Sequence, residues 1–251
     1  MSERMLMTRP LLEARHVSRR PDAFPPLENI SLSVSRGTIV GLTGPRGAGK
    51  TALLRTIARH IPFDGGRIWF NGQDISRRGM VRVARLGLQY LFQRPRVFAG
   101  LSCLENMLTA LPGCRQGLLA LFSGISRAEH HRAARLLRLV GLHALRHAPA
   151  ACLSPARKKL LELAMGLMSE PQLLLVDDPF HGVPPREHET MLNILRRANA
   201  ELGIAFLIGG HDMELITALA DYVYCLNHGA ITAAGPPEDI CRHQPETTAT
   251  S

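Results

Sequence analysis

The sequence lacks the features that mark membrane-spanning and disulfide-bonded proteins. It has no uninterrupted run of about 18 apolar residues, so we expect no segment that crosses a membrane by itself. Its five cysteines are dispersed and include no C-x-x-C pair, which argues against a disulfide framework or a zinc site and favours a reducing compartment. Residues 1–10 contain no apolar core of the length found in signal peptides.

Lysine is scarce as well, although the chain is strongly basic. Only Lys50, Lys158 and Lys159 occur, and arginine supplies almost all of a formal charge of +9 and a pI of about 10.0. This excess of positive charge is compatible with binding to nucleic acid, to an anionic membrane surface or to an acidic partner. It is equally compatible with a solvated surface rich in arginine, because no run of five like charges occurs. The charge alone therefore selects no function.

The clearest motif is a glycine-rich loop after residues 39–43. The apolar run there leads into a match to G-x-x-x-x-G-K-[ST], and apolar residues at helical spacing follow. In such a loop, glycines let successive backbone N–H groups point at phosphate oxygens, next to the start of a helix. A chance glycine turn is the alternative, and it would rarely fall between a buried strand and a helix. We therefore expect a nucleotide-binding site formed by Gly44, Pro45, Arg46, Gly47, Ala48, Gly49, Lys50, Thr51 and Ala52.

Four residues have specific expected roles in this site. Lys50 would reach the β- and γ-phosphates, and the Thr51 hydroxyl would ligate Mg²⁺. Asp177 ends the apolar run 173–176 at the edge where α/β sheets bind ligands, so we expect it beside Thr51 at the metal. Asp178 would orient the attacking water or accept its proton. The alternative for both carboxylates is a solvated turn after a strand.

The remaining pattern predicts an α/β fold with a P-loop NTPase core. Apolar runs alternate with helical segments and read as buried strands, which is typical of a mainly parallel sheet. Short strands joined by turns come first and are expected to form an antiparallel β part. A block with apolar residues at helical spacing interrupts the alternation. We expect a nucleotide-binding core of residues 11–93 and 170–235, an inserted helical subdomain of residues 94–169, and flexible tails at 1–10 and 242–251.

The order of motifs resembles the ATP-binding subunit of ABC transporters over nearly the whole chain, so that residues 11–251 would form one ATP-binding domain. After the phosphate loop come Gln93 ending an apolar strand, a helical segment, the signature stretch Leu153–Ser154, the strand ending in Asp177, and His211. More narrowly, the chain resembles the subunit of branched-chain amino-acid importers. The residues that carry this resemblance are Gly41–Pro45, Phe92–Phe98, Leu104–Asn106, an insert at Gly117–Gly124, Leu161–Ala164 and Gly210–Met213.

The resemblance implies an ATPase that works as a head-to-tail dimer enclosing two ATP molecules with Mg²⁺. Each ATP would be held by one chain's phosphate loop and the other chain's signature stretch, including Ser154. Gln93 would sense Mg²⁺ and the membrane partner, and His211 would contact the γ-phosphate and help hold the attacking water. The resemblance also implies a transmembrane permease, an indirect link to a solute-binding protein, and a peripheral location at the cytoplasmic face of the cell membrane.

Two departures from the family's pattern affect hydrolysis. Residues 153–157 read Leu-Ser-Pro-Ala-Arg, where the family has Leu-Ser-Gly-Gly-Gln or Leu-Ser-Tyr-Gly-Gln. We expect Pro155 to remove an N–H and the Cβ of Ala156 to obstruct the partner's γ-phosphate, while Ser154 also suits a helix cap. Asp178 stands where the family has Glu, and its carboxylate, one methylene shorter, is expected to position the water poorly.

Three further departures concern binding and dimer contacts. Ala52 lacks the usual hydroxyl near the α-phosphate, Pro184 replaces an Asn, and only Phe24 is available near residues 19–24 to stack on adenine. We expect a chain that binds Mg-ATP, hydrolyses it slowly and pairs best with a better-equipped ATPase chain, although a homodimer stays open. The alternatives are a nearly non-hydrolysing regulatory subunit, or a soluble ABC ATPase acting on nucleic acid. A single cassette without heptads disfavours the last.

Overall fold

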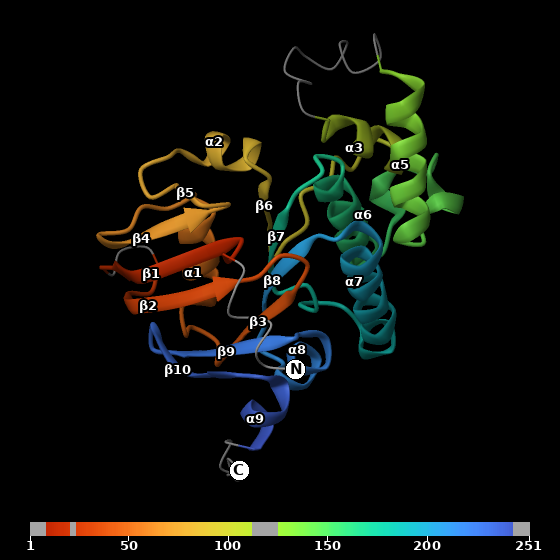
Figure 1. Ribbon diagram of the computed structural model, residues 1–251. Helices are drawn as coiled ribbons and strands as arrows, with labels where there is room; N and C mark the ends of the chain where they lie inside the picture. The colour runs from red at the N-terminus through yellow and green to blue at the C-terminus, as the bar shows by residue number, and fades with distance from the viewer. Residues whose placement is uncertain (1–8, 21–23, 112–124, 243–251) are drawn as a thin grey trace.

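The computed structural model describes residues 9–20, 24–111 and 125–242, and in these residues the chain forms two sheets with helices around them (Figure 1). The strands are β1 (Leu12–Arg19), β2 (Leu27–Val34), β3 (Ile39–Thr43), β4 (Gly65–Phe70), β5 (Gln73–Asp74), β6 (Leu88–Leu91), β7 (Leu173–Asp177), β8 (Ala205–Gly209), β9 (Tyr222–Asn227) and β10 (Ala230–Gly235). An antiparallel sheet has the order β2-β1-β4-β5, and a second sheet has the order β10-β9-β3-β8-β7-β6. In the second sheet only the β9–β10 pair is antiparallel. The predicted fold class is confirmed.

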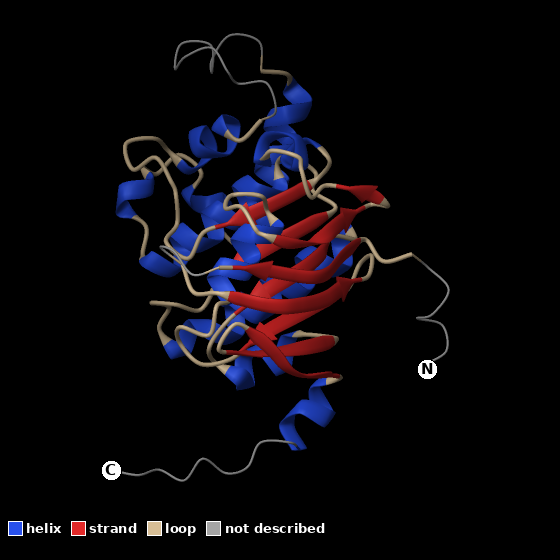
Figure 2. Ribbon diagram, turned by 90° about the vertical axis from the view of Figure 1, so that its left-hand side faces the viewer, coloured by secondary structure: helices blue, strands red, loops and turns tan. Residues whose placement is uncertain are grey.

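The larger sheet is the middle layer of the molecule. Leu173 and Leu175 of β7 pack with the antiparallel sheet and α1 (Lys50–Ile57), whereas Leu174 and Val176 pack with helices on the opposite face. Most helices lie on one side of the strands in Figure 2. Because both faces are covered, the parallel strands read as continuous apolar runs in the sequence. The helices of that outer layer include α6 (Pro155–Leu167), α7 (His188–Leu202) and α8 (Met213–Leu219).

The described part of the block between β6 and β7, residues 92–111 and 125–172, is mainly helical, as its spacing predicts. Its elements are α3 (Cys103–Thr109), α5 (Arg127–Leu139), α6 and the 3₁₀ turns η2 (His143–Leu145) and η3 (Ala150–Cys152). Two of the helices begin with capping boxes, in which Ser102 pairs with Glu105 and Ser126 with Glu129. The helices share one apolar core with the adjacent face of the larger sheet. The limits of this block as a separate subdomain stay a prediction.

Some boundaries differ from the sequence-based expectation. β6 ends at Leu91, so Gln93 lies in the following loop and not at the strand end. A short helix, α2 (Met80–Arg85), went unpredicted because Val83 is the one residue it buries. The sequence predicts a helix over 185–202, but α7 starts at His188 after a 3₁₀ turn, η4 (Pro185–Glu187). α9 (Pro237–Arg242) extends past residue 235, the expected end of the core.

Parts of the prediction lie outside the described residues. These are the insert at residues 117–124 and the tails, apart from residues 9, 10 and 242. Within the described part of the chain, no helix is both long and apolar enough to cross a membrane.

Candidate functional site

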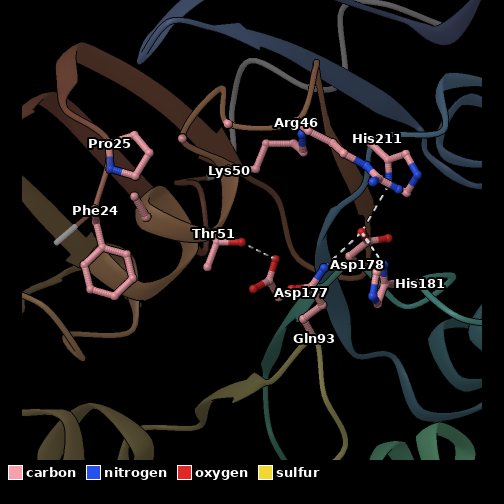
Figure 3. Close-up of a pocket in the computed structure, with 13 residues that line it drawn as sticks. Phe24, Pro25, Arg46, Lys50, Thr51, Gln93, Asp177, Asp178, His181 and His211 are labelled. Atoms are coloured by element: carbon pink, nitrogen blue, oxygen red, sulfur yellow. Dashed lines mark hydrogen bonds and ion pairs between the residues drawn. The ribbon is translucent and has the colours of Figure 1, made fainter. Parts of the chain in front are cut away.

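A cavity of about 310 Å³ opens where β3, β7 and β8 reach their carboxyl ends (Figure 3). Most residues predicted for the nucleotide site line it, together with Phe24, Pro25 and His181. The predicted residues in the lining are Arg46, Gly47, Gly49, Lys50, Thr51, Ala52, Gln93, Asp177, Asp178 and His211. Gly44, Pro45 and Ala48 belong to the same loop but do not line the cavity, and Ser154 lies apart from it.

The loop between β3 and α1 depends on glycine for its shape. Gly44 has a φ of +146°, and a Cβ there would lie 1.9 Å from a backbone oxygen of β9, so a larger residue does not fit. Lys50, the first residue of α1, folds back and donates from Nζ to the carbonyl oxygens of Gly44 (2.6 Å) and Pro45 (2.8 Å). Burial lowers the pKa of Lys50, against the opposing effect of Asp178 and Asp177. The ammonium group is thus held over the loop, where phosphate oxygens can replace these carbonyls.

Asp177 is the most deeply placed carboxylate of the site. Its Oδ1 accepts a hydrogen bond from the Thr51 hydroxyl (2.9 Å), and its Oδ2 accepts one from the Tyr90 hydroxyl (2.9 Å), to which Arg55 Nε donates in turn (3.2 Å). Burial raises the pKa of Asp177, while these hydroxyls oppose the rise. A hydroxyl and a carboxylate are the oxygen donors that Mg²⁺ prefers. The donor set therefore fits the predicted metal site, with the Gln93 amide in the same cavity.

Three side chains converge on one oxygen of Asp178. His211 Nδ1 lies 3.1 Å from Oδ2, Gln93 Nε2 lies 3.5 Å from it, and His181 Nδ1 lies 4.0 Å from it. The three predicted catalytic residues, Asp178, His211 and Gln93, are thus brought together. His181 had no predicted role.

The backbone of Asp178 is fixed from two sides. Its φ of +49° is unusual for a residue with a side chain, its N–H donates to Gly209 O (2.7 Å), and its carbonyl accepts from Lys159 Nζ (2.8 Å). Lys159 lies buried on α6. One turn further along α6, Glu162 Oε1 accepts from the N–H of Arg96, in the loop after Gln93 (3.0 Å). α6 is therefore linked both to the carboxylate site and to that loop.

The signature stretch forms the start of α6. Ser154 caps the helix by accepting a hydrogen bond from the N–H of Arg157 (3.3 Å), and Pro155 occupies the first turn, where proline is tolerated. Ala156 is only 2% exposed and packs in the helical core of its own chain. Its Cβ therefore points away from any docking surface, and our expectation that it obstructs a partner's γ-phosphate loses its physical basis. The N–H missing at Pro155 remains.

Phe24 lies at the opposite end of the cavity from Asp178 (Figure 3). The guanidinium groups of Arg55 and Arg19 lie 5.2 Å and 5.5 Å from the centre of its ring, within cation–π range. Phe24 lines the cavity. Its stacking on adenine stays a prediction.

Sequence reasoning assigned no role to Tyr90, Lys159, Glu162 or His181. Tyr90 lies in an apolar run and reads as a core position, and Lys159 ends the basic stretch 157–159 and reads as a solvated charge. The polar Glu162 inside an apolar helix face was a usable signal, because buried carboxylates are rare. His181 follows Asp178 by three residues, a spacing that a tight turn converts into proximity.

Known proteins share the fold and most of the chain length. A family model described as "ABC transporter" matches residues 27–181. The chain is 30% identical over 234 residues to a probable branched-chain amino acid transport ATP-binding protein, LivG, of Archaeoglobus fulgidus, covering 92% of this chain and 91% of the relative. It is 34% identical over 214 residues to the lipopolysaccharide export system ATP-binding protein LptB of Acidithiobacillus ferridurans, covering 85% of each.

Solved structures agree with these relatives. The crystal structure of the ADP conformation of an ATP-binding cassette from an ABC transporter superposes with a TM-score of 0.83 at 26% identity, covering 94% of this chain and 96% of that one. A dimeric ATP-binding cassette bound to ADP and phosphate matches with a TM-score of 0.74 at 20% identity, covering 90% of this chain and 98% of that one.

Proposed function

The chain belongs to the ABC transporter family of ATP-binding cassettes, which are ATPases, and we propose that it energises the import of amino acids or similar small polar solutes. In this proposal it binds Mg-ATP in a sandwich dimer with a second ATP-binding subunit. The dimer drives a separate transmembrane permease, which a solute-binding protein serves on the other side. The chain is then peripheral, at the cytoplasmic face of the membrane.

The observation that carries the proposal is the meeting of the phosphate loop, Asp177 and the Asp178 group in one cavity. Lys50 and the loop N–H groups bind and orient the phosphates, and Phe24 supports the base at the other end of the cavity. Thr51, Asp177 and Gln93 would hold Mg²⁺, which neutralises phosphate charge when bound. Asp178 and His211 then lie on the γ-phosphate side, where water attacks.

The direction of transport and the solute rest on the branched-chain amino-acid relatives, LivG and BraF of Pseudomonas aeruginosa. Other relatives are named for phosphonate import and lipopolysaccharide export, so the solute is the finer part of the proposal. We assign the permease contact to the surface around residues 93–98, because Phe98 is 57% exposed there, five residues after Gln93, which lines the cavity. An exposed aromatic of this size is typical of interfaces.

Hydrolysis by this chain is proposed to be slow. The side chain of Asp178 is one methylene shorter than that of the family's Glu, and its Oδ2 already lies 3.1 Å from His211 Nδ1. The carboxylate therefore lies further from the attacking water than a glutamate would. Pro155 supplies no N–H at the start of α6, which weakens the contribution of this chain to a partner's site. Ser154 remains the residue proposed to reach the partner's ATP. These points favour a second, better-equipped ATPase chain as partner, and they also support the alternative of a regulatory subunit with little turnover.

Two co-purification experiments test the proposal. The full chain, expressed in its own host and extracted with detergent, is expected to carry a polytopic membrane protein and no salt-sensitive RNA. Phe98→Ser is expected to reduce that association, whereas Met80→Ser, which alters a similarly exposed apolar side chain on α2, is not. Recovery of RNA in place of a membrane protein would favour the nucleic-acid ATPase.

Nucleotide binding is tested with a fluorescent ATP analogue and Mg²⁺. Lys50→Ala is expected to weaken binding by at least about tenfold, because a charge-assisted phosphate contact is lost. Lys158→Ala changes a lysine of α6 that does not line the cavity and serves as the control. Equal affinities of the two variants would contradict the assigned phosphate site.

A further inference from the structure

Of the three lysines of the chain, only Lys159 is buried, with 8% of its surface exposed. An ammonium group is rarely buried without a partner, because its transfer out of water is costly. Within the described part of the chain, Lys159 Nζ forms no ion pair and a single hydrogen bond, which it donates to the carbonyl oxygen of Asp178 (2.8 Å). The buried amine thus serves the backbone of one residue of the nucleotide site.

Asp178 has a backbone conformation that needs support. Its φ of +49° lies in the left-handed region, which residues with a side chain rarely occupy because it is strained. Its N–H donates to Gly209 O (2.7 Å), and its carbonyl oxygen accepts from the N–H of His181 (3.2 Å) as well as from Lys159. A hydrogen bond from a charged donor is roughly twice as strong as one between neutral groups. Lys159 therefore provides the stronger of the two holds on this carbonyl.

The backbone conformation of Asp178 decides where its carboxylate points. In the structure, Oδ2 lies 3.1 Å from His211 Nδ1 and 3.5 Å from Gln93 Nε2, and Figure 3 shows the side chain directed at both residues. A change of φ to a right-handed or extended conformation would rotate the Cα–Cβ bond and move the carboxylate away from these partners. Strained residues persist where the surrounding structure fixes them, and they are common at functional sites.

The packing of α6 places the ammonium group at the carbonyl. Lys159 lines a cavity of about 20 Å³ together with Leu91 of β6, Val176 of β7 and Met191 of α7. The methylene groups of the lysine thus have apolar neighbours, while Nζ reaches a polar atom at the edge of the nucleotide site. Because these neighbours limit its rotamers, the side chain is held ready to bind the carbonyl of Asp178.

We propose that Lys159 is a positioning residue for ATP hydrolysis, which holds Asp178 in the left-handed conformation that directs its carboxylate at the attacking water. This role rests on the proposed function, in which Asp178 orients that water or accepts its proton. Lys159 does not line the nucleotide cavity. Loss of its amine is therefore expected to slow the chemical step and to leave nucleotide binding intact.

Single-turnover hydrolysis of γ-labelled ATP by excess full-length protein measures the chemical step, and titration with a non-hydrolysable fluorescent ATP analogue measures binding. Lys159→Met and Lys159→Leu remove the donor and keep an apolar side chain in the same surroundings, so both are expected to fold. Lys158→Met is the matched control at the neighbouring, less buried lysine. Leu167→Ala removes a buried side chain at the end of α6 and controls for a loss of packing in this helix.

Both Lys159 variants are expected to hydrolyse ATP at least about tenfold more slowly than the wild type, because small displacements of a catalytic group are costly in rate. Their affinity for the ATP analogue is expected to stay within about twofold of the wild-type value. Lys158→Met is expected to match the wild type in both measurements. Leu167→Ala is expected to lower the midpoint of urea unfolding and to keep the hydrolysis rate within about twofold, because it leaves the bond to Asp178 in place.

Four results would overturn the role of Lys159. These are a wild-type rate in either Lys159 variant, a loss of affinity as large as the loss of rate, an equal loss of rate in Leu167→Ala, and a wild-type rate no higher than that of Lys50→Ala. Failure of the proposed function gives a different result, because a wild type that binds no nucleotide refutes the ATP site itself. Lys50-dependent binding and turnover that do not depend on Lys159 would leave the ATPase intact and refute only this inference.

Discussion

Glu162 offers a direct test of how α6 is packed against the nucleotide site. Its carboxyl group is 7% exposed and accepts from the N–H of Arg96, and burial raises its pKa from 4.5 to about 7 despite the opposing effects of backbone N–H groups and Lys159. The ionised form is thus disfavoured in the folded chain. Glu162→Gln keeps the shape of the side chain and an acceptor oxygen for the N–H of Arg96 but removes the titration.

The sign and size of the effect follow from the two pKa values. The folded chain holds this proton more tightly than the unfolded chain, so the contribution to stability is greatest below the unfolded value of 4.5 and is lost as the pH rises through about 7. Between pH 5 and pH 8 the loss from this single group is about 2.5 kcal/mol. Glu162→Gln lacks this loss. The free energy of unfolding of the variant minus that of the wild type is therefore expected to be about 2.5 kcal/mol larger at pH 8 than at pH 5.

Urea unfolding of the nucleotide-free chain at pH 5 and pH 8 measures this difference. Glu214→Gln, an exposed position at the start of α8, is the matched control and is expected to differ from the wild type by the same small amount at both pH values. A difference between Glu162→Gln and the wild type that does not change with pH would refute the burial argument. A difference that falls with pH would show that Lys159 outweighs desolvation.

Three further changes probe the site. Tyr90→Phe leaves Asp177 Oδ2 without its hydroxyl donor, and it is expected to weaken the Mg²⁺-dependent part of nucleotide affinity by about 1 kcal/mol. The control, Tyr222→Phe, is expected to leave that affinity unchanged. Equal Mg²⁺ titrations of the two variants would contradict this expectation. Ser154→Ala removes the cap of α6 and is expected to lower the free energy of unfolding by about 1 kcal/mol in urea titrations, and an unchanged midpoint would argue against the cap. Phe24→Ala is expected to weaken ATP and ADP binding alike by about 1–2 kcal/mol through lost stacking, and unchanged affinities would place the base elsewhere.

The fold was predictable where the backbone conformation or the burial of an element produces a local sequence pattern. The strands β3, β7 and β8 are buried on both faces and therefore appear as apolar runs, and the loop at Gly44 appears because no Cβ fits there. α2 has no such sequence pattern, because it buries one side chain and has no apolar helix face.

The predictable part of the site consists of residues that a motif fixes in order and spacing. The groups that tune it come from elsewhere in the sequence, as when Tyr90 on β6 reaches Asp177 or Lys159 on α6 reaches the backbone of Asp178. Such contacts depend on how layers pack, which local spacing does not encode. The inward Cβ of Ala156 is a further example, because its direction follows from the packing of α6 and not from the altered signature.

In the proposed function, the chain binds Mg-ATP through its phosphate loop and hydrolyses it slowly because Asp178 is short. This proposal is tested most directly by Mg-ATP binding and turnover of the purified chain beside Lys50→Ala and Asp178→Glu. We expect tight, Lys50-dependent binding with turnover that is low in the wild type and rises by on the order of tenfold in Asp178→Glu, because the longer carboxylate reaches the water. Ordinary turnover in the wild type, with no gain in Asp178→Glu, would contradict the account.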